Sequence, residues 1–292
     1  MKYGYYPGCY VQTRMLQYDL SARNILKKLG VEIVEMSDAP CCGPSVIKSV
    51  DYNMASALSA QILAMTEKRG LDAIVTLCPE CFSSFIKINT GFKEDAKFKD
   101  EVNHMLASTT SLKYDGGVEA KHLLQVLYDD IGPKELSKHI VKKFNGLKAA
   151  VHPGCHFTRA STSYYPDDPE NPKMLDELVE NLGIESVYWP LKLWCCGAPT
   201  LSFDRDLSLK TAGKKLSSAK ASGAECIVTA CPYCQMQFDQ NQAMIEKRVE
   251  EKFEVPSVLF TQLIGLGLGL SSEEVGLNMN RVSPDTILKF IE

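Results

Sequence analysis

The sequence lacks any apolar run long enough to cross a membrane, any excess of basic residues, and any flexible segment rich in glycine and serine. An apolar run at residues 263–270 contains three glycines. It is far shorter than the roughly 20 residues of a transmembrane helix, so we expect it to pack in the core or at a docking edge. With a net charge of −4 and interspersed charges, the chain predicts no nucleic-acid partner. Because residues 1–5 contain no apolar signal region, we expect a cytoplasmic location.

Cysteine, by contrast, is abundant, and ten of the 11 cysteines form two copies of one pattern. Each copy has a lone cysteine after Pro-Gly, then an adjacent pair followed by glycine, and then a Cys-Pro-x-Cys motif. The copies are Pro7-Gly8-Cys9, Pro40-Cys41-Cys42-Gly43-Pro44 and Cys78-Pro79-Glu80-Cys81, and then Pro153-Gly154-Cys155, Trp194-Cys195-Cys196-Gly197 and Cys231-Pro232-Tyr233-Cys234. Between the lone cysteine and the pair, and between the pair and the Cys-Pro-x-Cys motif, the nearest cysteines are separated by 31 and 35 residues in the first copy and by 39 and 34 in the second. This agreement predicts an internal duplication with five thiols in each half.

Predicted strands alternate with predicted helices in both halves. We expect strands at residues 2–6, 31–36, 73–77, 148–152, 185–189, 225–229 and 255–260. Helices are expected at 15–29, 49–69, 172–182, 204–222 and 231–251, and a further helix has Cys81 in its first turn and runs to about Asn89. Gly30 and Gly70 follow two of these helices, at positions where glycine commonly ends a helix.

Alternation of this kind predicts parallel βαβ units, in which ligands lie beyond the carboxyl ends of the strands. We therefore predict an α/β fold of two duplicated Rossmann-like lobes with parallel sheets, with the cysteines at the C-terminal strand ends. The first lobe would comprise residues 1–145 and the second 146–292. The first would include a polar, helical connector at 92–145, with helices over 118–130 and 133–143.

Five thiols per half, without carboxylates, favour a soft metal, which leaves zinc, copper(I) and iron–sulfur clusters as candidates. Structural zinc and ordinary cubane clusters each take four ligands, so a fifth thiol indicates a cluster of altered shape or a thiol left for chemistry. A reducing compartment and the odd total of 11 both disfavour a disulfide framework. Cys78 and Cys231 precede helices whose first-turn N–H groups would stabilise an anionic cluster. Gly43 and Gly197 would allow the backbone to approach a bulky cofactor closely.

The remaining cysteine and two histidines are weaker candidates. Cys226 is expected to be a buried structural thiol, because the repeat places it on Ala73 within a strand. His152 and His156 flank Cys155 and could donate protons or hydrogen bonds, although loop packing explains them as well.

Two arginines also lie near the lone cysteines. Arg14 and Arg159 each follow the lone cysteine of their half by a few residues, so they could meet anionic groups of a substrate or cluster, or could simply be solvated. The loop at 156–172, with its Tyr164-Tyr165 pair, is the largest difference between the copies, and loops of this kind commonly carry function.

These motifs make the chain similar to the cysteine-rich CCG domain, and over nearly its full length, including residues 260–270, it resembles the B subunit of heterodisulfide reductase. The resemblance implies two non-cubane [4Fe–4S] clusters as cofactors. The implied ligands are Cys9, Cys41, Cys42, Cys78 and Cys81 for one cluster, and Cys155, Cys195, Cys196, Cys231 and Cys234 for the other. No catalytic residues apart from these cluster ligands are implied.

The same resemblance implies a function. The chain would be the oxidoreductase subunit that reduces a small disulfide, the heterodisulfide of coenzyme M and coenzyme B in methanogenesis or a related one. Its implied partners in a multi-subunit complex are a ferredoxin-like C subunit and a flavin-containing A subunit. Disulfide reduction takes two electrons whereas an iron–sulfur cluster usually passes one, so two equivalent sites facing one cleft could each supply one.

Two other functions stay open from the sequence. The main alternative is an electron-transfer subunit of a quinone-linked or other redox complex with no heterodisulfide substrate, because related CCG subunits occur in such complexes. A zinc-stabilised scaffold is the third, and a metal analysis would distinguish it from the other two.

Overall fold

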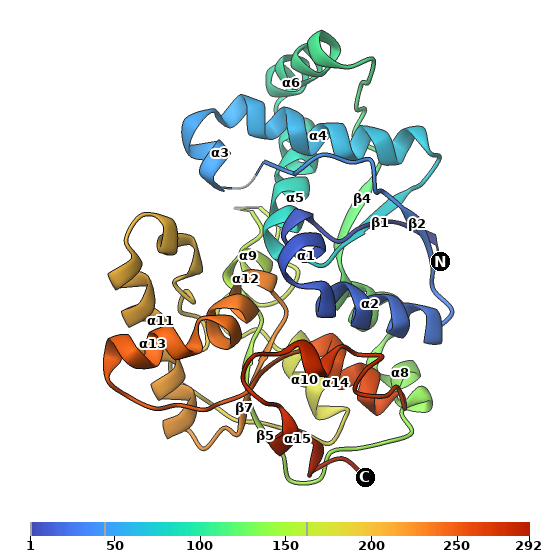
Figure 1. Cartoon of the computed structure of the whole chain (residues 1–292). Coiled ribbons are helices and arrows are strands. Elements are labelled where there is room, and N and C mark those ends of the chain that lie inside the picture. Colours follow the sequence, from blue (N-terminus) through green and yellow to red (C-terminus); the bar gives the residue numbers. More distant parts are fainter. Residues whose placement is uncertain (1, 44, 162) are drawn as a thin grey trace.

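The computed structural model describes residues 2–43, 45–161 and 163–292 (Figure 1). Met1 of the first predicted lobe, Pro44 of the first cysteine-pair motif and Thr162 of the loop at 156–172 lie outside the described residues. The chain forms two four-stranded sheets, ordered β2-β1-β3-β4 and β6-β5-β7-β8, in which neighbouring strands run parallel. The predicted α/β fold of two duplicated lobes with parallel sheets is confirmed.

Each half supplies one sheet and its helices. The first half contains β1 (Lys2–Tyr6), α1 (Cys9–Arg14), α2 (Leu16–Lys28), β2 (Glu32–Glu35), α3 (Ser45–Val50), α4 (Tyr52–Lys68), β3 (Ala73–Thr76), α5 (Pro79–Glu94), α6 (Ala96–Thr109), β4 (Glu119–His122), α7 (Leu123–Gln125), η1 (Val126–Ile131) and α8 (Pro133–His139). The second contains β5 (Lys148–His152), α9 (Cys155–Thr158), α10 (Met174–Glu180), β6 (Glu185–Ser186), η2 (Ala198–Ser202), α11 (Arg205–Ala221), β7 (Cys226–Thr229), α12 (Pro232–Gln235), η3 (Met236–Gln240), α13 (Gln242–Val249), β8 (Ser257–Leu259), α14 (Phe260–Gly267), η4 (Leu277–Met279) and α15 (Asp285–Leu288).

Helices α4 and α11 show how closely the two halves correspond. Each has 17 residues and begins after an aspartate, Asp51 or Asp204, whose side chain accepts a hydrogen bond from a first-turn backbone N–H group. Beyond each helix lies a glycine with positive φ, Gly70 at 66° and Gly223 at 78°. Because both ends are fixed in the same way, positions along the two helices can be matched one to one.

The prediction of a helix over residues 118–130 is wrong at its start. β4 pairs parallel with β3, so the connector supplies the fourth strand of the first sheet. Helical structure begins only at α7 and continues in the π-helical segment η1. In β4 the exposed Glu119 precedes the buried Ala120. A four-residue pattern of this kind is too short for periodicity to separate a strand from a helix.

The position of Cys9 is a second correction. It is expected on a loop after β1, but it is the first residue of α1, which a break at Met15 separates from α2. The backbone N–H group of Val11 donates to the carbonyl of Gly8, so the helix begins at the motif itself. Cys155 opens α9 in the same way. Both lone cysteines are therefore held at the start of a helical turn.

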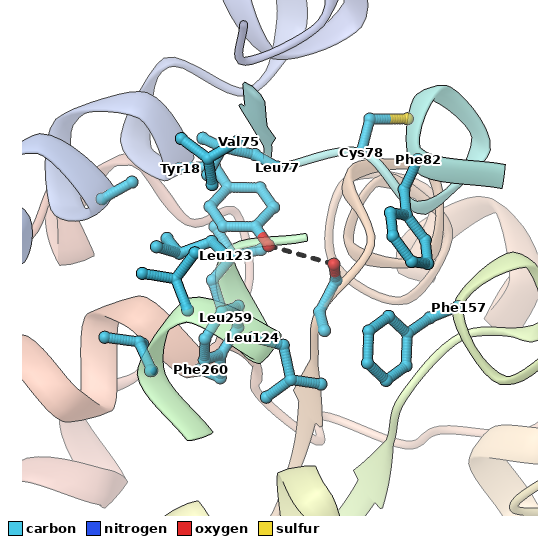
Figure 2. Packing of buried hydrophobic residues seen from close by; sticks show 14 of the residues in the cluster. Tyr18, Val75, Leu77, Cys78, Phe82, Leu123, Leu124, Phe157, Leu259 and Phe260 are labelled. Atoms are coloured by element: carbon cyan, nitrogen blue, oxygen red, sulfur yellow. Dashed lines mark hydrogen bonds between the residues drawn. The ribbon is translucent and has the colours of Figure 1, made fainter. Parts of the chain in front are cut away.

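The two halves share one hydrophobic core (Figure 2). The hydroxyl of Tyr18 in α2 donates a hydrogen bond of 3.0 Å to the carbonyl of Ala230, just after β7, and its ring meets Phe260 of α14 edge-on at 6.1 Å. Every residue of α14 is buried, and this helix packs beside α2 (Figure 1). The apolar run at 263–270 thus serves largely for core packing, and the predicted lobes are joined by packing as well as by the chain.

Candidate functional site

The repeated cysteines lie where strands end. Cys9 follows β1, and Cys78 follows β3 as the residue that caps α5. Cys155 follows β5, and Cys231 follows β7 as the residue that caps α12. The two adjacent pairs come after β2 and β6 along the chain. Because parallel strands end at the same edge of a sheet, this placement brings the thiols of each half together.

In the first half, five thiols form a connected series of contacts. The Sγ atom of Cys9 lies 3.4 Å from that of Cys41, and the Sγ atom of Cys42 lies 3.2 Å from that of Cys81. Cys41 also interacts with Cys42, and Cys81 with Cys78. All five line a small cavity of about 10 Å³.

The second half repeats this series in the same order. Cys155 interacts with Cys195, and Cys195 with Cys196. The Sγ atom of Cys196 lies 3.3 Å from that of Cys234, which contacts Cys231. A cavity of about 270 Å³ is lined by four of these thiols, Cys195 being the exception. The structure therefore gathers the ten predicted thiols into two sets of five, and their role as cluster ligands stays a prediction.

The first cysteine of each adjacent pair, Cys41 or Cys195, has a lowered pKa. Hydrogen bonds from Cys42 and Cys9 lower the pKa of Cys41 well below its ordinary value. Hydrogen bonds from Cys155 and Cys196 lower the pKa of Cys195 in the same way. In the second set the backbone N–H group of Gly197 also donates to the Cys195 sulfur at 3.3 Å. The thiolate is the metal-binding form of cysteine, so each set already favours a ligand at this position.

Gly8 and Gly154 hold the backbone against the thiols. Their φ angles are 94° and 91°, which side chains rarely adopt. A Cβ atom on Gly8 would lie 3.2 Å from the Sγ atom of Cys81, and one on Gly154 would lie 3.4 Å from the Cβ atom of Cys231. Glycine therefore permits the backbone conformation beside each set and, at Gly8, a close approach to the thiols. Five soft donors with this close backbone fit an iron–sulfur cluster.

Gly43 and Gly197 each lie close to a helix, and their predicted approach to a cofactor stays a prediction. A Cβ atom on Gly43 would lie 2.9 Å from the Cα atom of Ala55 in α4, and one on Gly197 would lie 2.8 Å from the carbonyl oxygen of Ser208 in α11. The Ser208 hydroxyl also donates to the Gly197 carbonyl at 2.8 Å. These glycines let the loop that carries each cysteine pair pack directly on a helix.

The two sets of thiols adjoin each other. Glu80 and Tyr233 line both cavities, and they occupy the same variable position in the Cys-Pro-x-Cys motifs of the two halves. The ring of Tyr233 stacks on Tyr10, beside Cys9, with ring centroids 4.4 Å apart. Each motif thus contributes one side chain to the wall of the other half's cavity. This arrangement supports the prediction that the two sites face each other.

The two histidines differ in what they can reach. His156 lines the larger cavity, and burial lowers its pKa, so its ring is neutral near pH 7. His152 is buried, and its Nδ1 atom donates to the carbonyl of Lys192 at 3.0 Å. Its Nε2 atom has no hydrogen-bond partner among the described residues. His156 is therefore the one placed to contact a substrate.

Arg14 and Arg159 are both exposed, and neither lines the cavity beside a thiol set. Arg159 donates to the carbonyl of Pro169 at 3.3 Å, which ties it to the loop at 156–172. Within that loop Tyr164 packs edge-on against Phe82 of the first half at 6.2 Å. Both arginines fit the solvated interpretation better than a role in binding.

Lys215 is a further candidate functional residue, and the cysteine motifs do not indicate it. It is fully buried in α11, and its charge acts on four thiols of the second set. The sequence does carry a signal for it. Lys215 lies on a helix face whose other residues are buried, at the position that Ile62 occupies in α4.

Other features of the molecule are less suited to thiol chemistry. Two hollows of about 720 Å³ each flank Trp194, and the described residues that line them include no cysteine. Among residues 2–43, 45–161 and 163–292, no three His, Cys, Asp or Glu side chains are placed to hold a single metal ion. The same residues contain no helix with both the length and the apolar character needed to cross a bilayer.

Comparison with known proteins agrees with the duplicated cysteine pattern. The cysteine-rich CCG domain matches residues 3–86 and 149–239. Over 284 residues the chain is 34% identical to the B subunit of the ferredoxin/F(420)H(2)-dependent CoB-CoM heterodisulfide reductase of Methanosarcina acetivorans, covering 96% of this chain and 94% of that protein. It is 31% identical over 279 residues to the 8-methylmenaquinol:fumarate reductase membrane anchor subunit of Wolinella succinogenes, covering 96% of both.

A solved structure shows the same fold. The crystal structure of a hypothetical protein from Helicobacter pylori superposes with a TM-score of 0.77, covering 97% of this chain and 52% of that one, at 12% identity. At this identity the likeness concerns the fold alone. The matching domain spans both halves, and the relatives named for a heterodisulfide reductase are aligned over nearly their whole length. The chain therefore belongs to the cysteine-rich CCG-domain family and is related to the B subunits of heterodisulfide reductases.

Proposed function

We propose that the protein is the iron–sulfur subunit of a heterodisulfide-reductase-type complex and that it reduces a small disulfide. The observation that carries this proposal is the pair of equivalent five-thiol sets that adjoin across Glu80 and Tyr233. Each set would hold one non-cubane [4Fe–4S] cluster through its five cysteines. When bound, the two clusters would supply one electron each to the two-electron reduction of a disulfide.

The part of the second set's cavity that a bound cluster would leave free is the candidate substrate site. The whole cavity has a volume of about 270 Å³, whereas the cavity beside the first set measures about 10 Å³. Ala198, Pro199 and Phe203 give it an apolar wall, and His156 adds a polar group beside the thiols. A site of this size and lining suits part of a small organic disulfide. Tyr233 and Glu80 would then lie between the substrate site and the first set.

The chain's own residues would position the substrate rather than cleave it. Neutral His156 can donate a hydrogen bond to a departing thiolate, and the apolar wall limits the access of water to that sulfur. We propose that the complex also contains a ferredoxin-like C subunit and a flavin-containing A subunit. The relatives named above are subunits of reductases, which supports a multi-subunit setting.

A second candidate is an electron-transfer subunit without a disulfide substrate. The specific observation in its favour is the 31% identity to the membrane anchor subunit of a fumarate reductase. That relative is also why the expected cytoplasmic location stays a prediction.

Disulfide turnover in ligand variants separates the two candidates. Anaerobically purified protein would be reduced with a viologen dye and offered the coenzyme M–coenzyme B heterodisulfide, with free thiols as the measured product. We expect turnover in the wild type and none in Cys81→Ser or Cys234→Ser, although each variant retains one reducible cluster. Cys226→Ser, which changes a buried cysteine outside both sets, is the matched control and should keep its turnover. Full reduction of both clusters without any thiol product would favour the electron-transfer role.

A further inference from the structure

The two halves differ at one buried position close to the thiols. Lys215 is the eleventh residue of α11, and Ile62 is the eleventh residue of α4. Both side chains are 0% exposed. Since the two helices have equal lengths and equivalent ends, the duplication places a cation in the second half where the first half has a hydrocarbon side chain.

The amine of Lys215 is held next to the loop that carries the second cysteine pair. It donates to the carbonyl of Leu191, to that of Trp194 at 2.8 Å and to that of Lys192 at 3.4 Å. It also lies 4.5 Å from the centroid of the Trp189 ring. Trp194 immediately precedes the cysteine pair, so these contacts fix the cation just behind the second set.

The charge of Lys215 is not neutralised by a carboxylate. Within the described ranges no Asp or Glu lies within ion-pair distance of it, whereas the neighbouring Lys192 pairs with Asp176 at 2.7 Å. Burial lowers the pKa of Lys215 to about 8, so the amine is still mostly protonated at pH 7. Among the thiols of that set, its charge interacts most with Cys234 and Cys196 and then with Cys195 and Cys155.

We propose that Lys215 raises the reduction potential of the cluster held by the second cysteine set above that of the first. This inference rests on the proposed function, since both sets must hold clusters. A reduced cluster is more negative than an oxidised one, so a nearby buried cation stabilises the reduced form, and low dielectric strengthens the effect. The first set has Ile62 at the matched position and gains no such stabilisation.

The inference gives the two sites different roles. At equilibrium the first electron resides at the second set, beside the cavity of about 270 Å³ rather than the one of about 10 Å³. The roomier site, where a substrate can enter, is thereby the better electron acceptor of the two. Lys215 acts through the cluster without touching the substrate, and is therefore a positioning residue.

Three substitutions separate the charge of Lys215 from its role in holding the loop. Lys215→Arg keeps the charge, Lys215→Gln keeps a hydrogen-bond donor without the charge, and Lys215→Met keeps neither. EPR-monitored redox titration of the full chain would give both midpoint potentials in each variant. We expect the Gln and Met variants to weaken reduction of one cluster at least tenfold, which is about 59 mV for one electron, and to leave the other unchanged. The Arg variant should stay near the wild type.

Unchanged midpoint potentials in Lys215→Gln would overturn the inference. A midpoint shift in Lys215→Arg as large as that in Lys215→Gln would also overturn it, because the Arg variant keeps the charge. A second measurement needs no change at Lys215: the cluster retained in Cys81→Ser should have a higher midpoint than the one retained in Cys234→Ser, and the reverse order would overturn it. Absence of clusters from the wild type would instead refute the proposed function, so the two failures are distinguishable.

Discussion

Replacing Gly8 by alanine tests whether the first thiol set binds a cluster through the geometry described above. Gly8 has φ 94° and ψ 146°, a conformation that disfavours any side chain, so the substitution costs about 1–3 kcal/mol of stability from the backbone alone. Its new Cβ atom would also lie 3.2 Å from the Cβ atom of Cys78 and from the Sγ atom of Cys81. Carbon atoms prefer about 3.5–4.0 Å, so the thiols must move by several tenths of an ångström. We expect loss of the first cluster and about half the iron of the wild type.

Two further glycines provide matched controls. Gly132 has φ 87° and ψ 144° at the start of α8, and its nearest neighbour for a new Cβ atom is the carbonyl of Tyr128 at 3.9 Å. Gly132→Ala should therefore lose similar stability and keep all its iron. Gly154→Ala places its Cβ atom 3.4 Å from that of Cys231, an ordinary contact, and should keep most of its iron. Iron and acid-labile sulfide per chain, measured with thermal unfolding, give the comparison. Equal iron in the Gly8 and Gly132 variants would refute the reasoning.

Two other substitutions test separate parts of the structure. Cys226 is fully buried in β7 outside both sets. Cys226→Ala should therefore cost about 1 kcal/mol of stability and keep the full iron content, whereas Cys196→Ala should lower the iron content. Iron loss from the Cys226 variant would show that the repeat alignment is wrong. Burial raises the pKa of Asp239 to about 6, above its value in the unfolded chain, so its native state favours the protonated form and this contribution is lost as pH rises through 6. Relative to Asp239→Asn, the wild type should therefore lose up to about 3 kcal/mol of unfolding free energy between pH 4 and pH 7. Melting temperatures of both proteins from pH 5 to 7.5 would show part of this loss. A difference in stability between the two proteins that does not change with pH would contradict the prediction.

The duplication is what made the site predictable. Once Cys231 was matched to Cys78, the same offset placed Cys226 on Ala73, and the structure has these two residues as the first of β7 and β3. Helix ends marked by glycine, such as Gly70, were also placed correctly. Sequence spacing identifies which thiols gather because it fixes which strand end each one follows.

The features that sequence reasoning missed depend on contacts between distant segments. β4 is a strand because β3 offers it a partner, which its short pattern does not reveal. Gly197 packs against Ser208, eleven residues later, and only the folded loop shows that helix α11 lies beside it. Lys215 reads as an ordinary helix lysine until its burial is known.

The central claim, that ten thiols hold two four-iron clusters, is tested most directly by metal and sulfide analysis of the anaerobically purified chain. We expect about eight iron atoms and a matching amount of acid-labile sulfide per chain. Zinc at near-stoichiometric levels with little sulfide would contradict it.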